Sequence, residues 1–159
     1  MIKGKRILIF GAAGSIGSEL TRQLYKNNKV YCVDFNEVGL LELMNELNIN
    51  GRVGDIRNEN TVRDIYSDFK PQIIFHAAAL KQVPMCEYNP FEAVKTNILG
   101  TQNVIELARE LNVEKVVSIS TDKVVDPTGV LGSSKLMGEK LVLASFYYQG
   151  HKKTKFSCV

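Results

Sequence analysis

Short runs of apolar residues alternate with longer segments of helical periodicity along the whole of this 159-residue chain. The runs are continuously apolar, which is typical of strands covered on both faces of a parallel sheet. The segments between them are long enough to form crossover helices. Right-handed crossovers then predict an α/β fold with a doubly wound parallel sheet, Rossmann-like, in the strand order 3-2-1-4-5-6. The expected strands cover residues 6–10, 30–33, 52–53, 73–75, 115–120 and 154–159.

Several of the expected helices begin or end at recognisable signals. Pro71 stops one helix, Pro90 lies in the first turn of another, and Gly150 follows the last as a C-terminal stop. Ser15 is expected to cap the first helix. With no repeat and no linker, the chain is predicted to be one domain, residues 1–159. The expected helices cover residues 15–27, 37–47, 59–69, 90–111 and 133–148.

The composition of the chain argues against several classes of protein. The 20 basic and 17 acidic residues give a net charge of +3 without a dense basic run, so we expect no nucleic-acid partner. No apolar run approaches the roughly 20 residues that span a bilayer, and we expect no signal peptide before the first strand. Cys32, Cys86 and Cys158 are widely spaced and odd in number, which favours reduced thiols over a disulfide or metal site. These features predict a cytoplasmic protein without a metal.

A glycine-rich loop joins the first strand to the first helix. Its sequence runs Gly11-Ala12-Ala13-Gly14-Ser15-Ile16-Gly17, and a flexible loop is the alternative to a binding site. Gly11 would allow the tight turn, Gly14 would let a pyrophosphate approach the backbone, and Gly17 would let the helix pack against the sheet. The helix N-terminus supplies unpaired N–H groups for the phosphates, so the loop, with Ser15 and Ile16, predicts a dinucleotide site.

Acidic and small residues follow the next three strands. Asp34 ends the second strand about 20 residues after the glycines, where a carboxylate can accept hydrogen bonds from the ribose hydroxyls and repel a 2′-phosphate. NAD is therefore expected rather than NADP. Asp55 and Ile56 are placed to flank an adenine, although each aspartate could also be a turn residue. His76 is expected to be packed and hydrogen-bonded, and the small residues after it leave room for the cofactor: Ala77, Ala78 and Ala79.

Opposite charges stand next to each other after the fifth strand. Asp122 and Lys123 follow the apolar run at the carboxyl end of the sheet, where open α/β folds bind ligands. They could serve as an acid and a base, or they could be a helix cap or a solvated ion pair.

The chain resembles the extended short-chain dehydrogenases/reductases, and within them the nucleotide-sugar 4,6-dehydratases of polysaccharide and glycan biosynthesis. The resemblance covers essentially all of the chain and is carried by four segments: His76 to Pro90 with Lys81, Lys95 to Thr101 with Asn97, Ser120-Thr121-Asp122-Lys123, and Gly132-Ser-Ser-Lys135. It implies NAD-dependent dehydration of UDP-N-acetylglucosamine, in which C4 is oxidised, a proton leaves C5, the C6 hydroxyl departs, and hydride returns to C6.

The resemblance also implies roles for single residues. Lys123 would be the base, Asp122 the acid, and Thr121 would contact the C4 oxygen. Lys135 would hold the nicotinamide ribose, and Lys81 would lie near the cofactor or the substrate. The usual catalytic tyrosine, four residues before Lys135, is replaced by Leu131. A branch of the dehydratases resembles this chain in carrying an apolar residue there, which leaves Thr121, Lys123 and Lys135 as candidate bases for oxidation at C4.

Two other functions stay open: a nucleotide-sugar epimerase or reductase, and a non-catalytic dinucleotide-binding module, which Leu131 favours. Helices 90–111 and 133–148 are rich in apolar residues, and packing within the core of the chain would explain most of them. Related enzymes dimerise through these helices, so the resemblance implies a homo-oligomer. The chain ends inside an expected strand. We therefore expect the segments that bind the UDP-sugar to follow residue 159, and the 159 residues alone to bind NAD weakly and turn over little substrate.

Overall fold

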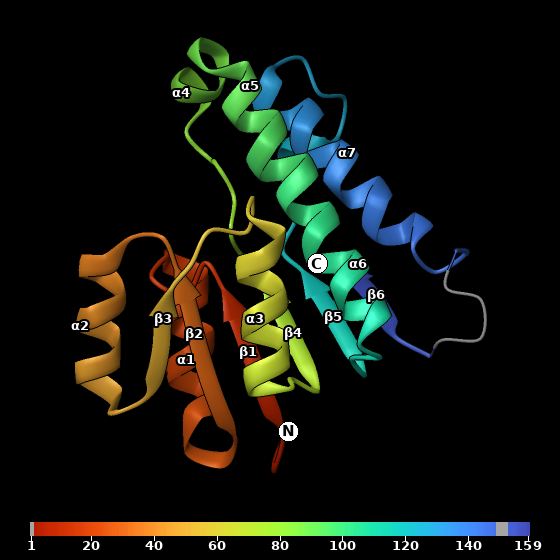
Figure 1. Cartoon of the computed structure of the whole chain (residues 1–159). Coiled ribbons are helices and arrows are strands. Elements are labelled where there is room, and N and C mark those ends of the chain that lie inside the picture. Colours follow the sequence, from red (N-terminus) through yellow and green to blue (C-terminus); the bar gives the residue numbers. More distant parts are fainter. Residues whose placement is uncertain (1, 149–152) are drawn as a thin grey trace.

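A computed structural model of the chain describes residues 2–148 and 153–159. Its centre is a six-stranded parallel sheet in the order β3-β2-β1-β4-β5-β6, so the predicted fold and strand order are confirmed (Figure 1). The order reverses between β1 and β4, which are neighbours in the sheet. The strands are β1 Arg6–Phe10, β2 Lys29–Asp34, β3 Asn50–Val53, β4 Ile73–His76, β5 Lys115–Ser118 and β6 Lys155–Cys158.

Helices cover both faces of the sheet. The first two pack on one face, and α3, α6 and α7 cover the other, as right-handed crossovers require (Figure 1). The helices are α1 Ser15–Leu24, α2 Glu37–Leu47, α3 Glu59–Phe69, α4 Val83–Tyr88, α5 Pro90–Ala93, α6 Thr101–Glu110 and α7 Val130–Ala144. Among the described residues, no helix combines the length and the apolar character that a membrane span requires.

Alternate residues of β1 contribute to two hydrophobic clusters, one on each face of the sheet. Ile7 and Ile9 join the cluster beneath α1 and α2, whereas Leu8 and Phe10 join the cluster beneath α3 and α6. All four side chains are buried. The continuous apolar run that predicted this strand therefore reflects a sheet with a hydrophobic layer on each face.

Asparagine caps set the starts of α2 and α3. The side chains of Asn36 and Asn58 accept hydrogen bonds from Gly39 N and Thr61 N in the first turns of these helices. Both helices have the predicted bounds, because local capping and periodicity are enough to define them.

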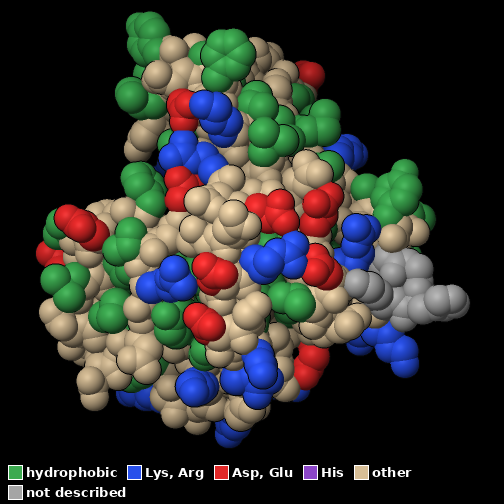
Figure 2. Space-filling view, viewed as in Figure 1, with side chains coloured by type: hydrophobic (Ala, Val, Ile, Leu, Met, Phe, Trp, Pro, Cys, Tyr) green, Lys and Arg blue, Asp and Glu red, His purple; other side chains and the backbone are tan. Residues whose placement is uncertain are grey.

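The expected helix 90–111 is continuous but not regular. It runs as α5, a π-helical segment Val94–Gly100 and α6. The preceding helix α4 was not predicted, although Pro84 in its first turn is the signal that would have indicated it. Exposed apolar side chains gather at the end of the molecule that α4 and α5 form, among them Val83, Met85, Tyr88 and Phe91 (Figure 2).

The last helix differs at both ends from the prediction of 133–148. It begins at Val130, whose N–H donates to Glu87 Oε1 of α4 at 2.7 Å, so a distant carboxylate caps it. It ends at Ala144, after which hydrogen bonds to residues three back, Phe146 N to Leu143 O and Tyr147 N to Ala144 O, interrupt the regular helix. The stop expected at Gly150 lies outside the described residues.

Candidate functional site

A cleft of about 690 Å³ opens at the carboxyl ends of the strands, where the strand order reverses. Open α/β sheets bind ligands at this position. Every residue predicted to bind cofactor lines the cleft except Lys135. The predicted residues are Gly11, Gly14, Ser15, Ile16, Gly17, Asp34, Asp55, Ile56, Ala77, Ala78, Ala79 and Lys81. Lining residues that were not predicted include Phe35, Asn36, Arg57, Leu80, Met85, Asn89, Glu92 and Thr96.

Two glycines of the loop are required by close backbone contacts. Gly11 has φ +75°, and a Cβ there would lie 2.5 Å from Ala78 N. A Cβ on Gly17 would lie 2.1 Å from Gly11 O. Gly11 makes the tight turn, as expected. Gly17 lets the start of α1 approach the backbone of the loop, whereas its expected role in packing the helix against the sheet stays a prediction. Gly14 is less restricted, because its nearest neighbour would be 3.3 Å away, and its contact with a pyrophosphate stays a prediction.

The N-terminus of α1 faces the cleft without a side-chain cap. The cap position is Gly14, no side chain accepts a hydrogen bond there, and no acidic residue lies in the first turn. The expectation that Ser15 caps the helix is wrong, because Ser15 is already its first residue. Helices α2 and α3 each have an asparagine cap and an acidic first turn, so α1 differs in leaving its first N–H groups available to an anion.

Asp34 is fixed at the end of β2 by two backbone donors. Its Oδ2 accepts from Ala13 N at 2.9 Å, and its Oδ1 accepts from Asn36 N at 2.9 Å. A carboxylate has about four acceptor positions, so positions remain for ribose hydroxyls. The first bond also links β2 to the glycine loop, which holds the two parts of the site together.

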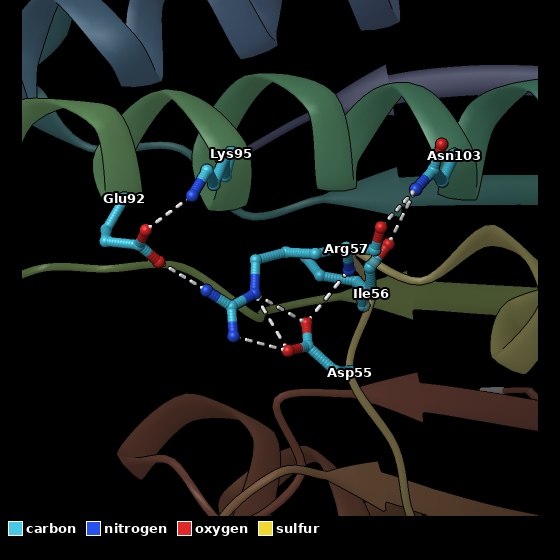
Figure 3. Close-up of polar contacts among 6 residues, drawn as sticks. All are labelled: Asp55, Ile56, Arg57, Glu92, Lys95 and Asn103. Atoms are coloured by element: carbon cyan, nitrogen blue, oxygen red, sulfur yellow. Dashed lines mark hydrogen bonds and ion pairs between the residues drawn. The ribbon is translucent and has the colours of Figure 1, made fainter.

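Asp55 does not stand alone, because Arg57 binds its carboxylate. Arg57 Nη2 donates to Asp55 Oδ2 at 2.6 Å, and its Nη1 donates to Glu92 Oε2 of α5 at 2.5 Å (Figure 3). Burial acts to raise the pKa of Asp55, but the hydrogen bonds and charge of Arg57 outweigh it and lower that pKa. Ile56 is mostly buried in the core beneath α3 and α6 and presents only a small surface to the cleft.

Asn97 holds the segment that follows β4. Its Oδ1 accepts from Leu80 N at 2.9 Å, and its Nδ2 donates to Leu80 O at 3.1 Å and to Ser134 Oγ at 3.0 Å. This buried amide, which lies in the π-helical segment, therefore ties the wall of the cleft to α7. Lys81, the next residue along that wall, is exposed at the cleft.

His76 is a packed core residue, as expected. Its Nε2 lies 2.9 Å from Thr101 Oγ1, whose hydroxyl donates to Asn97 O at 2.8 Å. The hydroxyl oxygen must then accept from Nε2–H, which leaves Nδ1 unprotonated and without a partner among the described residues. Burial, with a smaller effect of the charge of Lys135, lowers the pKa of His76 to about 3, so the ring is neutral.

Thr121, Asp122 and Lys123 lie outside the cleft lining, on a 3₁₀ turn after β5. The side chain of Asp122 is 89% exposed, and Lys123 Nζ lies 3.5 Å from its Oδ1. A hydrogen bond from the Thr121 hydroxyl, with the charge of Lys123, lowers the pKa of Asp122. In this structure Asp122 is therefore an ionised carboxylate at neutral pH.

Lys135 is also outside the cleft lining and is partly buried. Its Nζ donates to Ile119 O at 2.7 Å, and it lines a small polar cavity with Ser120, Glu139 and Cys158. Burial lowers the pKa of Lys135, and the negative charge of Glu139 opposes the shift. The Cys158 thiol has a pKa raised to about 11 and is neutral near pH 7, so it adds no charge there.

Leu131 occupies the position of the usual tyrosine but is only 5% exposed. It packs with Cys86 and Ala93 in a small cluster between α7 and the helices α4 and α5. All three cysteines of the chain are free in this structure, and their reduced state stays a prediction. Within the described part of the chain, no three His, Cys, Asp or Glu side chains come together in a way that could hold a metal ion.

The fold and the cleft together define the structural class of this protein. A crevice at the switch point of a doubly wound sheet, beside a glycine turn, is the ligand site of Rossmann-type domains, and this chain is of that class. Residues 7–159 match the family described as polysaccharide biosynthesis protein, so the chain belongs to that family. The family resemblance inferred from the sequence motifs is thereby confirmed.

Two curated relatives illustrate the family. The chain is 48% identical to an uncharacterized membrane protein, MJ1061, of Methanocaldococcus jannaschii, over 99% of the chain and 48% of the relative. It is 39% identical to a UDP-N-acetylglucosamine 4,6-dehydratase (inverting) of Campylobacter jejuni, over 99% of the chain and 48% of the relative. The chain therefore spans about half the length of these relatives.

Two solved structures share the fold. Pen from Bacillus thuringiensis matches with a TM-score of 0.91 and 39% identity over 98% of this chain and 49% of that one. The UDP-glucose 4-epimerase of Thermus thermophilus, solved in complex with NAD, matches with a TM-score of 0.78 and 25% identity over 96% of this chain and 53% of that one.

Proposed function

We propose that the cleft binds NAD. The observation that carries the proposal is the uncapped N-terminus of α1 beside a loop that close contacts restrict to glycine, with the Asp34 carboxylate at the far side of the loop. These residues fit a dinucleotide: N–H groups for the pyrophosphate, an acceptor for the ribose, and the small residues 77–79 along the wall. The NAD complex of the Thermus thermophilus epimerase supports the proposal.

The charges near Asp34 favour NAD over NADP. Asp34 is held by backbone N–H groups and cannot move away from a 2′-phosphate, which it would repel. Arg57, which could otherwise bind such a phosphate, is already paired with two carboxylates. A nucleotide with an unmodified ribose is therefore the better match.

The protein acts, in this proposal, on a UDP-N-acetylhexosamine and converts it to a 4-keto-6-deoxy sugar nucleotide for polysaccharide or glycan biosynthesis. NAD would supply hydride acceptance at C4 and hydride return at C6. The chain would supply proton transfer, with Lys123 as the base at C5 and Asp122 as the acid at the C6 hydroxyl. Thr121 would contact the C4 oxygen, Lys135 would hold the nicotinamide ribose, and one of Thr121, Lys123 and Lys135 would accept the proton of the C4 hydroxyl. Positioned acids and bases typically contribute roughly 100- to 10,000-fold each to the rate.

Asp122 must gain a proton to act as the acid. The hydrogen bond from Thr121 and the charge of Lys123 hold the pKa of Asp122 low in this structure. A bound sugar that covers Asp122 would exclude water and raise its pKa, because burial disfavours the charged form. The proposed role therefore requires substrate to cover the turn at 121–123. Because the chain spans about half of its relatives, we propose that segments after residue 159 help to do so.

The test is to incubate the protein, at the full length that its gene encodes, with NAD and UDP-N-acetylglucosamine. Mass spectrometry is expected to show a product lighter by one water, which the variants Asp122→Asn and Lys123→Met no longer form. Asp126→Asn and Lys140→Met change exposed residues of the same types nearby and serve as matched controls.

Three other results would contradict the dehydratase. A product of unchanged mass but altered configuration would identify an epimerase, the activity named for the Thermus thermophilus relative. Bound NAD with an unchanged sugar would identify a non-catalytic module, which the burial of Leu131 favours. A full-length protein that does not bind the dinucleotide would refute the proposed cofactor site.

A further inference from the structure

Arg57 holds the carboxylate of Asp55 from one side. Its Nε donates to Oδ1 at 3.0 Å and to Oδ2 at 2.8 Å, and its Nη2 donates to Oδ2 at 2.6 Å. Its own backbone N–H donates to Oδ1 at 2.9 Å. A planar guanidinium makes such a forked contact in one orientation, so the plane of the carboxylate is defined as well as its position.

These contacts leave Asp55 with limited capacity to accept more. A carboxylate offers about four lone-pair positions. Arg57 supplies three N–H donors to them: Nε, Nη2 and the backbone N. About one acceptor position therefore remains, on a residue that lines the cleft.

The guanidinium cannot easily leave this orientation, because it is also held at its other end. Nη1 donates to Glu92 of α5 at 2.5 Å, and Lys95 Nζ donates to the second oxygen of Glu92 at 2.8 Å. Asn103 Nδ2 donates to Ile56 O at 2.9 Å, which fixes the backbone of the same turn to α6 (Figure 3). The turn at 55–57 is thus bound to the helix above it at two points.

We infer that Arg57 is a positioning residue that sets the base selectivity of the cleft. It orients Asp55 so that a single acceptor position is available to an N–H donor of a purine. This inference rests on the proposed NAD site. The 6-amino group of adenine supplies such a donor, whereas the 6-oxo group of hypoxanthine places an acceptor opposite the carboxylate. Against hypoxanthine, the remaining acceptor position of Asp55 would face another acceptor and lose its donor, which is more costly than losing a neutral hydrogen bond.

A lysine would not replace Arg57 in this role. Its ammonium group is a compact charge on a flexible stem, so it could neutralise Asp55 without defining the plane of the carboxylate. It also could not reach two carboxylates through separate nitrogen atoms, as Arg57 does with Asp55 and Glu92. The variant Arg57→Lys therefore keeps the positive charge beside Asp55 but removes the contact that orients its carboxylate.

The test measures the affinity of the full-length protein for NAD and for nicotinamide hypoxanthine dinucleotide by calorimetry. The wild type is expected to bind NAD roughly tenfold or more tightly. In Arg57→Ala and in Arg57→Lys the preference is expected to fall below about threefold, and Glu92→Gln should give an intermediate value. Arg63→Ala is the matched control, because Arg63 pairs with Glu59 and Glu110 on the outer surface, and it should keep the wild-type preference.

The outcomes separate this inference from the cofactor proposal. A wild type that binds NAD without preferring it, or an Arg57→Ala protein that keeps the preference, would overturn the role of Arg57 and leave the NAD site standing. A wild type that binds neither dinucleotide would overturn both. Circular dichroism verifies that each variant is folded, and Arg57→Lys carries the test if Arg57→Ala does not fold. A merely structural role would lower both affinities equally and leave their ratio unchanged.

Discussion

Replacing Gly17 with alanine should destabilise the protein although it adds a better helix former. In a free helix, the change from glycine to alanine is worth about 1 kcal/mol in favour of the helix. Here the added Cβ would lie 2.1 Å from Gly11 O and 2.8 Å from Ala12 Cα, both backbone atoms. The loop cannot move away, because a Cβ at Gly11 itself would be 2.5 Å from Ala78 N, which shows how closely the backbone behind it approaches.

The size of the effect follows from these opposing contributions. Overpacking costs about 1–3 kcal/mol and occasionally more, and contacts with backbone on both sides place this site at the upper end. After the helix propensity is subtracted, we expect a net loss of about 2 kcal/mol in the free energy of unfolding. For a domain of this size, that loss lowers the melting temperature by roughly 4–8 °C.

Thermal and urea unfolding, followed by circular dichroism, measure this loss. Gly14→Ala is the matched control, because its Cβ would meet only Gly11 O at 3.3 Å and its φ of −74° suits alanine. The control should lose no more than about 1 kcal/mol, because alanine caps a helix less well than glycine, while binding NAD more weakly. A Gly17→Ala protein as stable as the wild type, or more stable, would refute the reasoning about close approach.

Three further predictions concern buried groups. The pKa of His76 is about 3 in the folded state and about 6.5 in the unfolded state, so the unfolded state binds more protons between these pH values. The free energy of unfolding should therefore rise with pH by up to about 1.4 kcal/mol per pH unit from pH 3 to 6.5. Urea titrations of His76→Gln should show a flatter rise. Asn97→Ala removes the three hydrogen bonds of a buried side chain and should lower the free energy of unfolding by about 2–4 kcal/mol. Asn45→Ala changes an exposed asparagine and should leave stability unchanged, so equal urea midpoints for the two variants would contradict this. Leu131→Tyr restores the tyrosine spacing but should lower the free energy of unfolding by about 1–3 kcal/mol without a gain in activity. Leu131→Met should lower it by less than about 1.5 kcal/mol. An increase in turnover of Leu131→Tyr would show that position 131 reaches the substrate.

The expected homo-oligomer remains a prediction. Val104 and Leu107 are buried within the chain, whereas Leu111, Leu143 and Phe146 are exposed on or just after the same helices. Part of the apolar excess therefore belongs to the core, and part is available for contact between copies.

Local patterns in the sequence determined the strand order, the bounds of two helices and most residues of the cleft. The continuously apolar strands and the handedness of crossovers were enough for the strand order, and the bounds of α2 and α3 followed from periodicity and residues next to them in sequence. The cleft residues were predictable for the same reason, because the carboxyl ends of parallel strands converge at one edge. Each of these features depends on short-range sequence and one general rule of topology.

Only the tertiary structure decided how distant residues pair. Arg57 meets Glu92, which is 35 positions away, and Glu87 sets the start of α7 from 43 positions away. The burial of Leu131 against Cys86 and Ala93 and the neutral state of His76 depend in the same way on neighbours brought together by folding. Side-chain pairing and burial are properties of non-local contacts, and no spacing within the sequence encodes the distance between two such side chains.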